Sequence, residues 1–372
     1  MIVNGVPYRT IWRRREGVIA LIDQRFLPHR FVVKEVRTVE EMARAIREMH
    51  IRGAIALGAA AAYGLELAAV SAPDDRLRMA LQRAATVLQQ TRPTAVNIAW
   101  AVATVMAAVD GIEQPQELRF RLLQAVDALV EAEVDRCRRI GEHGARLLQQ
   151  LAEQRDGRPL NILTHCNAGW LGCVDYGTAL APVYVAAEAG IPLHVWVSET
   201  RPRNQGSALT AWELQQQGIP YTIVVDSACG HLVQRGMVDV AIVGADRISR
   251  RGDTANKIGT YLKALACHRH GVPFYVAAPS SSVDWGLSDG LQAIPIEERS
   301  PDEVLTTSGW DGEGVATVRV APEGAPAWNP AFDVTPAELI TGFITEHGVI
   351  QPTEAALEAL ARNAYVRVRG DR

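Results

Sequence analysis

The chain has 372 residues and a formal net charge of −4, with 48% hydrophobic and 22% charged residues. This is the composition of a soluble globular protein, long enough for two domains that each bury a core. The small negative net charge provides no overall basic field, so we expect no nucleic-acid partner. The first residues, MIVNGVPYRT, show no basic region followed by an apolar stretch, so no secretory signal is expected.

The N-terminal part of the chain predicts a small sheet followed by helices. Short β-rich runs between polar turns occupy residues 10–36. Thr38 and Glu41 have the spacing of a capping box, which opens an amphipathic helix that extends to about His50. Helical patterns follow at 54–70, 75–90, 95–109 and 116–154, the last interrupted near Gly141 and Gly144. We therefore predict a helical N-terminal domain over residues 1–154 that carries a small β-sheet.

The longest apolar stretch, residues 54–70, consists mostly of alanine and contains Glu66. It is weakly hydrophobic for a membrane span, and it predicts a buried helix instead. We expect no membrane partner.

The second half of the chain alternates short apolar runs with helical segments, and we assign residues 155–372 to a second domain. The runs are 160–165, 192–198, 220–225, 238–244 and 272–278. Four of them follow a glycine that is typical of a helix end. This alternation predicts an α/β domain with a mainly parallel sheet covered by helices. The polar, glycine-bearing segments that follow the strands should converge on one crevice, because open α/β sheets bind ligands beyond the carboxyl ends of their strands.

Two residues at these strand ends are candidates for chemistry. Cys166 precedes Gly169, which could open a helix whose positive end would lower the thiol pKa. A buried structural cysteine explains the position equally well, and for neighbouring His165 a histidine satisfied in the core is favoured over an orienting role. Asp246 ends a very apolar strand, where desolvation would raise its pKa and retain the proton that a general acid needs. A salt bridge to Arg247 or the capping of a following helix are the alternatives.

Three predicted helix starts carry groups that suit an anion. Arg52 and Gly53 open the first, Arg92 precedes the second, and Asn256 and Lys257 lie at the start of the third. For Arg52 and Gly53 the alternative is helix packing through small residues. For Arg92 the alternative is an ordinary surface arginine. Lysine is scarce in this chain, which contains only Lys34, Lys257 and Lys263. An arginine cannot replace a compact ammonium group, so Lys257 is of interest, although chance explains its presence equally well.

Other ligands are disfavoured. The five cysteines are odd in number and scattered, without a C-x-x-C pair, at positions 137, 166, 173, 229 and 267. This pattern argues against a zinc ribbon or a disulfide framework and favours a reducing cytoplasm. No G-x-G-x-x-G motif follows the first strand of the second half and no Walker lysine motif occurs, which disfavours a nucleotide.

Taken together, the segments IRGA, GAAAAYG, RPTAVN, THCNAG, YGTAL, ETRP, LTAWEL, VGADRI, ANKIGTY and GVPFYVAAP occur in one order along the chain. This order resembles the methylthioribose-1-phosphate isomerase family of methionine salvage. That family shares its fold with regulatory subunits of the translation-initiation nucleotide exchange factor and with archaeal ribose-1,5-bisphosphate isomerase. The resemblance runs from about residue 5 to 350, and it implies a Rossmann-like C-terminal domain, a homodimer and aldose–ketose isomerisation without a metal or other cofactor.

The resemblance also implies roles for individual residues. The catalytic cysteine and acid of the family fall on Cys166 and Asp246, and both are intact, which disfavours a purely regulatory relative. Its substrate-contacting residues fall on Arg52, Gly53, Ala54, Arg92, Gln205, Asn256 and Lys257. The chain departs from the family pattern at Ile55, usually proline, at Ser198, usually aspartate, and at Trp170, usually small. Trp170 adjoins the catalytic loop, so the preferred 5-substituent of the sugar stays open, and 5-deoxyribose 1-phosphate and ribose 1,5-bisphosphate are alternative substrates.

Overall fold

The structure is a computed structural model that describes residues 1–93 and 95–361. It divides into two compact units, Met1–Cys137 with Trp170–Gly177, and Arg138–Gly169 with the chain from Thr178 onward. This division passes through helix α5 (Pro115–Glu153). The expected domain boundary after residue 154 stays a prediction, and the two units are described separately below.

The first unit begins with the predicted small sheet. Strands β1 (Ile2–Val3) and β2 (Val6–Pro7) form a short ribbon, and β3 (Ile11–Arg15), β4 (Val18–Ile22) and β5 (Val33–Val36) form an antiparallel sheet. Helix α1 (Val39–Arg47) follows, and Thr38 Oγ1 accepts the Glu41 N–H at 3.1 Å as a capping box requires. The Glu41 carboxylate, however, accepts the N–H of Arg37 rather than that of Thr38.

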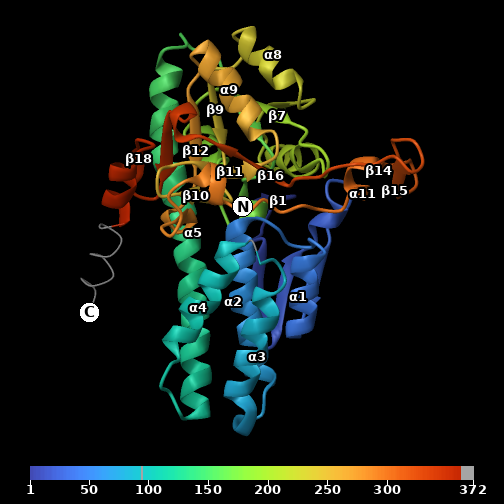
Figure 1. Cartoon of the computed structure of the whole chain (residues 1–372), viewed down its shortest axis with the longest axis vertical. Helices are drawn as coiled ribbons and strands as arrows, with labels where there is room; N and C mark the ends of the chain where they lie inside the picture. Colours follow the sequence, from blue (N-terminus) through green and yellow to red (C-terminus); the bar gives the residue numbers. More distant parts are fainter. Residues whose placement is uncertain (94, 362–372) are drawn as a thin grey trace. The chain divides into compact units, whose positions relative to one another are not determined.

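Helices α2 (Ala54–Ser71), α3 (Leu77–Gln89) and α4 (Val96–Ala108) pack together in the first unit (Figure 1). Within the described residues, α2 is the one helix long and apolar enough to cross a membrane, and 83% of it is buried inside the protein. Its Glu66 side chain is fully buried and accepts hydrogen bonds from Arg13 Nε at 2.5 Å and Nη2 at 2.6 Å. As predicted, α2 is a core helix of this unit.

Helix α5 is continuous, so the expected interruption near its two glycines is wrong. A Cβ atom at Gly144 would lie 2.3 Å from Cγ of Pro182, and one at Gly141 would lie 3.0 Å from Val185. Both contacts are to α6 (Ala181–Glu188). The glycines therefore serve close helix packing, which outweighs the roughly 1 kcal/mol that each costs in a helix interior.

The second unit contains the predicted mainly parallel sheet, and the α/β, Rossmann-like fold class is confirmed. Its strand order is β18 (Gly348–Ile350), β17 (Gly342–Thr345), β12 (Phe274–Ala277), β9 (Val240–Val243), β6 (Leu160–His165), β7 (Leu193–Ser198) and β8 (Tyr221–Val224). All neighbours are parallel except β18, which is antiparallel to β17. Helices α7 (Ala211–Gln216), α8 (Ala228–Gln234) and α9 (Thr260–His270) lie between strands in the sequence. The helix-ending glycines 190, 218, 236 and 271 all adopt positive φ, as their C-cap role requires.

The second unit also contains a smaller, four-stranded sheet. It consists of β13 (Val283–Asp284), β10 (Arg247–Ser249), β11 (Thr254–Lys257) and β16 (Phe332–Thr335). Asn256 and Lys257 thus end a strand, and α9 begins only at Thr260, so their expected place at a helix start is wrong. In the antiparallel β11–β16 pairing Asn256 lies opposite Asp333 and Lys257 opposite Phe332, and the chain then reaches the Gly259 N-cap of α9.

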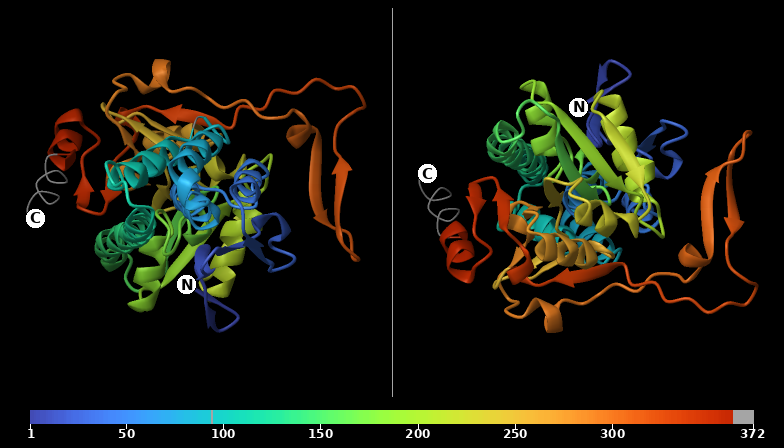
Figure 2. Two further views of the ribbon diagram at one scale, coloured as in Figure 1. Left: turned by 90° about the horizontal axis from the view of Figure 1, so that it is seen from below. Right: turned by 90° about the horizontal axis from the view of Figure 1, so that it is seen from above.

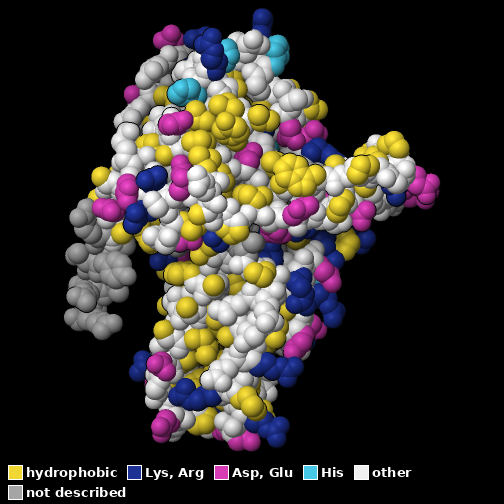
Figure 3. Space-filling view, in the orientation of Figure 1, with side chains coloured by type: hydrophobic (Ala, Val, Ile, Leu, Met, Phe, Trp, Pro, Cys, Tyr) yellow, Lys and Arg dark blue, Asp and Glu magenta, His cyan; other side chains and the backbone are white. Residues whose placement is uncertain are grey.

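The remaining elements of the second unit are short. Helices α10 (Gly290–Ala293) and α11 (Asp302–Leu305) precede a hairpin of β14 (Thr306–Trp310) and β15 (Val315–Arg319), which extends away from the sheet (Figure 2). Hydrophobic side chains are exposed on this hairpin and on α9, where Leu262 is 68% exposed (Figure 3).

The buried Arg13–Glu66 pair gives a stability prediction. Arg13→Ala leaves the Glu66 carboxylate buried without its bidentate partner, so unfolding of the first unit should become easier by about 3 kcal/mol. The control is Arg14→Ala in the same strand, because Arg14 is 57% exposed and pairs with Glu35. That change should cost about 1 kcal/mol or less. Urea unfolding monitored by circular dichroism measures both, and equal losses would contradict the prediction.

Candidate active site

The centre of the large sheet is a topological switch point. Strand β6 pairs with β7 on one side and with β9 on the other, and the chain runs from β6 through β7 to β8 before it returns to β9. Ligands of open α/β sheets bind where the strand order reverses. Cys166 directly follows β6, and Asp246 lies three residues after β9. The structure therefore brings both predicted residues to the ends of adjacent strands at this point.

The backbone of Cys166 is held in an unusual conformation. Its φ is +62°, in the left-handed region that costs a non-glycine residue about 1–3 kcal/mol unless its surroundings fix it. The Cys166 N–H donates to Thr200 Oγ1 at 2.8 Å, and its carbonyl accepts from Thr210 Oγ1 at 2.6 Å. The thiol is mostly buried, and Sγ lies 3.2 Å from Gln205 Oε1. A side chain fixed in this way suits a residue that must address one atom of a ligand.

Only a three-residue 3-10 helix, Trp170–Gly172, follows Gly169, and one turn aligns too few peptide groups to lower the thiol pKa as a longer helix would. Gly169 is required for close approach, because a Cβ atom there would lie 1.9 Å from Glu213 Oε2. Glu213 is fully buried and accepts hydrogen bonds from Asn167 at 2.8 Å and Tyr184 at 2.5 Å. Glu213 thereby anchors the segment after Cys166, a role that the sequence did not reveal.

His165 is the core histidine that the sequence favours. It is buried, and its Nε2 lies 2.8 Å from the Ile258 carbonyl, which can only accept a hydrogen bond. Nδ1 lies 3.1 Å from Ser198 Oγ. Burial, and then the nearby charge of Lys263, lower the pKa of His165 to about 3. The ring is therefore neutral near pH 7 and carries its proton on Nε2.

Asp246 is half-buried, and its N–H donates to the Ala255 carbonyl at 2.9 Å. The capping alternative is wrong, because strand β10 follows Asp246 instead of a helix. Arg247 Nη1 lies 3.5 Å from Asp284 Oδ2 on neighbouring β13, so the Arg247 guanidinium has another carboxylate partner.

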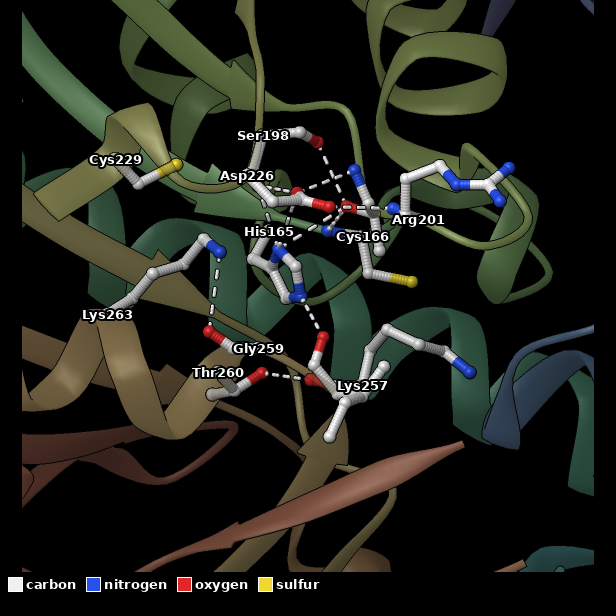
Figure 4. Close-up of polar contacts among 12 residues, drawn as sticks. His165, Cys166, Ser198, Arg201, Asp226, Cys229, Lys257, Gly259, Thr260 and Lys263 are labelled. Atoms are coloured by element: carbon white, nitrogen blue, oxygen red, sulfur yellow. Dashed lines mark hydrogen bonds and ion pairs between the residues drawn. The ribbon is translucent and has the colours of Figure 1, made fainter. Parts of the chain in front are cut away.

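Gln205 and Lys257 line one pocket of the second unit, together with Thr200, Arg201, Pro202, Arg203, Arg299, Glu303, Asn329 and Ala331. Lys257 Nζ lies 4.6 Å above the ring of Phe332. Figure 4 shows the side chains of Cys166 and Lys257 pointing to the same side, away from the Lys263 side chain. Asn256 is buried and donates to Thr260 Oγ1 at 3.0 Å. Gln205 and Lys257 are thus brought together in one pocket, whereas Asn256 bonds to the start of α9.

The other predicted substrate residues belong to the first unit. Arg52 is buried and precedes α2, Gly53 is its N-cap with φ +93°, and Ala54 is its first residue. A Cβ atom at Gly53 would lie 2.2 Å from the Gly172 carbonyl oxygen, so only glycine fits. Arg92 is half-buried and precedes α4. Residues 52–54 therefore lie at a helix start, as predicted, where free N–H groups favour an anion.

Trp170 also belongs to the first unit. It is fully buried, and its carbonyl accepts a hydrogen bond from Thr10 at 2.7 Å. Its burial is that of a core residue and gives no support to the idea that it shapes a pocket for the 5-substituent.

Sequence reasoning missed a polar network beside Cys166. Asp226 accepts hydrogen bonds from the backbone N–H groups of Thr200 at 2.8 Å and Arg201 at 2.7 Å, and from Ser198 Oγ. Burial acts to raise the pKa of Asp226, but these hydrogen bonds and the charge of Lys263 outweigh it, so that the pKa is lowered. Lys263 is itself buried. The scarcity of lysine was the available signal, because two of the three lysines lie around this site.

No group of three or more His, Cys, Asp or Glu residues that could hold a metal ion occurs in the part of the chain that the structure describes.

Comparisons with known proteins extend this picture. Residues 50–352 match the model of the initiation factor 2 subunit family. A methylthioribose-1-phosphate isomerase of Gluconobacter oxydans (strain 621H) is 50% identical over 364 residues, covering 97% of this chain and 98% of the relative. The crystal structure of 5-methylthioribose 1-phosphate isomerase from Pyrococcus horikoshii OT3 matches with a TM-score of 0.84 and 40% identity over 96% of each chain. That of the translation initiation factor eIF-2B delta subunit from A. fulgidus matches with a TM-score of 0.78 and 42% identity, covering 93% of this chain and 96% of that one.

The lowered pKa of His165 predicts a pH dependence of stability. An unfolded histidine has a pKa of about 6.5, and that of His165 in the fold is about 3. Between these values the unfolded chain binds more protons, so the free energy of unfolding should fall as the pH falls through this window. Urea unfolding at several pH values between about 7 and 4.5 measures the fall. His165→Asn, which removes the titrating group, should show a smaller fall, and equal slopes for variant and parent would refute the assignment.

Proposed function

The chain belongs to the initiation factor 2 subunit family and, within it, to the methylthioribose-1-phosphate isomerases, and on this premise we propose that it converts 5-methylthioribose 1-phosphate to 5-methylthioribulose 1-phosphate. The reaction is an aldose–ketose isomerisation of methionine salvage. The observation that carries the proposal is the placement of Cys166 and Asp246 after adjacent strands at the switch point of the sheet.

The substrate sets a specific chemical problem. Its anomeric oxygen carries the phosphate, so the furanose ring cannot open to a free aldehyde. Isomerisation must break the bond between C1 and the ring oxygen, protonate that oxygen, move one hydrogen from C2 to C1 and release the proton of the C2 hydroxyl. C1 is reduced while C2 is oxidised, so the atoms and electrons balance without an external oxidant.

Asp246 is the proposed general acid. Its protonated carboxyl donates to the ring oxygen, and the carboxylate then regains the proton released by the C2 hydroxyl. An unperturbed aspartate has a pKa of about 3.9 and is almost wholly ionised near pH 7. The proposal therefore requires that water be excluded from Asp246 when the substrate is bound, because desolvation favours the protonated form of a carboxyl group. The ion pair of Arg247 with Asp284 supports the proposal, because it gives this neighbouring cation another partner.

Cys166 is the proposed residue at C1 and C2. In the proton route it removes the C2 hydrogen as a proton and returns it to C1 through an enediol-like phosphate; in the hydride route it stabilises the transfer. The Gln205 amide, 3.2 Å from Sγ, suits both forms of the sulfur, because its oxygen accepts from a thiol and its NH₂ group donates to a thiolate. We assign the sugar hydroxyls to Gln205 and Asn256, and the phosphate to Lys257, Arg52, Arg92 and the N–H groups at Gly53 and Ala54.

A regulatory subunit without turnover is the second candidate, favoured by the 42% identity to the eIF-2B delta subunit structure. The intact pair of Cys166 and Asp246 supports the isomerase. A homodimer, a cytoplasmic location and turnover without a cofactor stay predictions for this chain. Assaying the purified protein on 5-methylthioribose 1-phosphate, 5-deoxyribose 1-phosphate and ribose 1,5-bisphosphate tests the activity and its alternatives together, and failure to turn over any of them would overturn the proposal.

The two catalytic assignments predict matched losses of turnover. Cys166→Ser and Asp246→Asn should each lower kcat by at least ~10²-fold, the lower range for loss of a positioned proton-transfer group. Substrate binding should change little, since both variants keep the shape of the side chain. Asp239→Asn is the control, because Asp239 lies just before the amino end of β9, on the opposite end from Asp246. Near-normal kcat in either variant would remove that residue from the mechanism.

The phosphate assignment predicts a loss of affinity. Lys257→Ala and Arg52→Ala should each weaken substrate binding by ~1.5–3 kcal/mol, the range for hydrogen bonds to charged groups. Calorimetric titration with substrate, using variants that also carry Cys166→Ser to prevent turnover, measures the change. Lys34→Ala is the matched lysine control, because Lys34 lies on β5 and contacts His50. The assignment fails if the sugar binds equally well with and without its phosphate.

A further inference from the structure

The loop after β7 is fixed by one carboxylate. Asp226 Oδ1 accepts from Ser198 Oγ and from the Thr200 N–H, and Oδ2 accepts from the Arg201 N–H. Asp226 follows β8, the edge strand beside β7. The carboxyl ends of these two strands are therefore joined by hydrogen bonds of side chain and backbone in addition to the sheet ladder.

Thr200 extends this network to Cys166. Its Oγ1 accepts the Cys166 N–H at 2.8 Å and donates to the Ser198 carbonyl at 2.9 Å. Thr200 has a φ of +65°, which is costly for a β-branched residue and requires fixed surroundings. The hydrogen bonds of Asp226 to residues 198, 200 and 201 hold Thr200 in this conformation. The Thr200 hydroxyl, which accepts the Cys166 N–H, in turn holds the left-handed backbone of Cys166.

We infer that Asp226 is a positioning residue for Cys166, acting through the Thr200 hydroxyl to aim the thiol at the reacting carbons. The inference rests on the proposed function, in which Cys166 meets the substrate. In this arrangement Asp226 and Thr200 act on the substrate only through the position of Cys166. They therefore contribute to turnover and little to substrate affinity.

An ionised carboxylate is required at position 226. The donors lie on both oxygens, and an amide could accept at only one of them. Buried Lys263, whose Nζ lies 3.3 Å from the Gly259 carbonyl, provides the compensating positive charge (Figure 4). Its charge acts on Asp226 and on His165, which supports a neutral His165 beside an ionised Asp226.

The test compares two substitutions of Thr200. Thr200→Val keeps the branched shape but removes the hydroxyl, so the Cys166 N–H loses its acceptor, and kcat should fall at least ~10-fold with KM changed less than ~3-fold. Thr200→Ser restores the hydroxyl and should recover most of that loss. The control is Thr222→Val on β8, because exposed Thr222 bonds to His194 away from this network, and it should leave kcat unchanged. Equal kcat in the Val and Ser variants at position 200 would overturn the inference.

Asp226→Asn gives an independent measurement. It should lower kcat at least ~10-fold and slow the alkylation of Cys166 by iodoacetamide, followed by peptide mass spectrometry, as the thiol loses its fixed orientation. Urea unfolding of each variant separates loss of positioning from loss of folding. Cys166→Ser distinguishes the two levels of the proposal. If Cys166→Ser is inactive while Asp226→Asn and Thr200→Val retain parental kcat and alkylation rates, the positioning role is wrong and the proposed function stands; if Cys166→Ser is fully active, the proposed role of Cys166 fails first.

Discussion

The candidate site depends on the parallel pairing of β6 with β9. The ladder sets Leu163 opposite Ala241, so three further residues along each strand lead to Cys166 on one side and Gly244 on the other. Asp246 then lies two residues beyond. Because side chains alternate across a strand, a slip of one residue would turn Cys166 toward the opposite face of the sheet. The buried, apolar character of both strands opposes such a slip.

The elements that position this site could be predicted from local patterns in the sequence. Apolar runs predicted β6, β7, β8, β9 and β12 within two residues at each end, and helix-ending glycines preceded all of them except β6; both signals are local. The topological rule then placed Cys166 and Asp246 at one edge. Only the family resemblance pointed to Gln205, whose contact with Cys166 joins residues far apart in the sequence.

Other features depend on tertiary contacts that local patterns do not contain. Gly141 and Gly144 resemble helix breakers until Pro182 is seen to occupy the space that a Cβ would need. Gly169 resembles a helix start until Glu213 is found against it. Asp226 resembles a turn residue after an edge strand, and only the folded loop shows that it accepts three hydrogen bonds beside Cys166. The glycines are present because a side chain would not fit, and the aspartate because a charge is needed. In the sequence alone, the same residue types suggest a helix end or a turn.

Ser198, which stands where the family pattern has an aspartate, has a physical explanation in this network. Ser198 Oγ donates to Asp226 and lies 3.1 Å from His165 Nδ1, so the hydroxyl lies between an anion and a neutral ring. An aspartate in the same place, which the family resemblance implies as the usual residue, would set a second carboxylate against Asp226. Like charges at hydrogen-bond distance cannot both ionise easily, so one of the two would retain a proton and the pair would titrate together. With serine at 198, Asp226 holds its charge without such competition and can accept from Thr200 and Arg201 at once. Serine at position 198 therefore leaves one carboxylate instead of two in the network beside Cys166. Its hydroxyl still donates a hydrogen bond to Asp226.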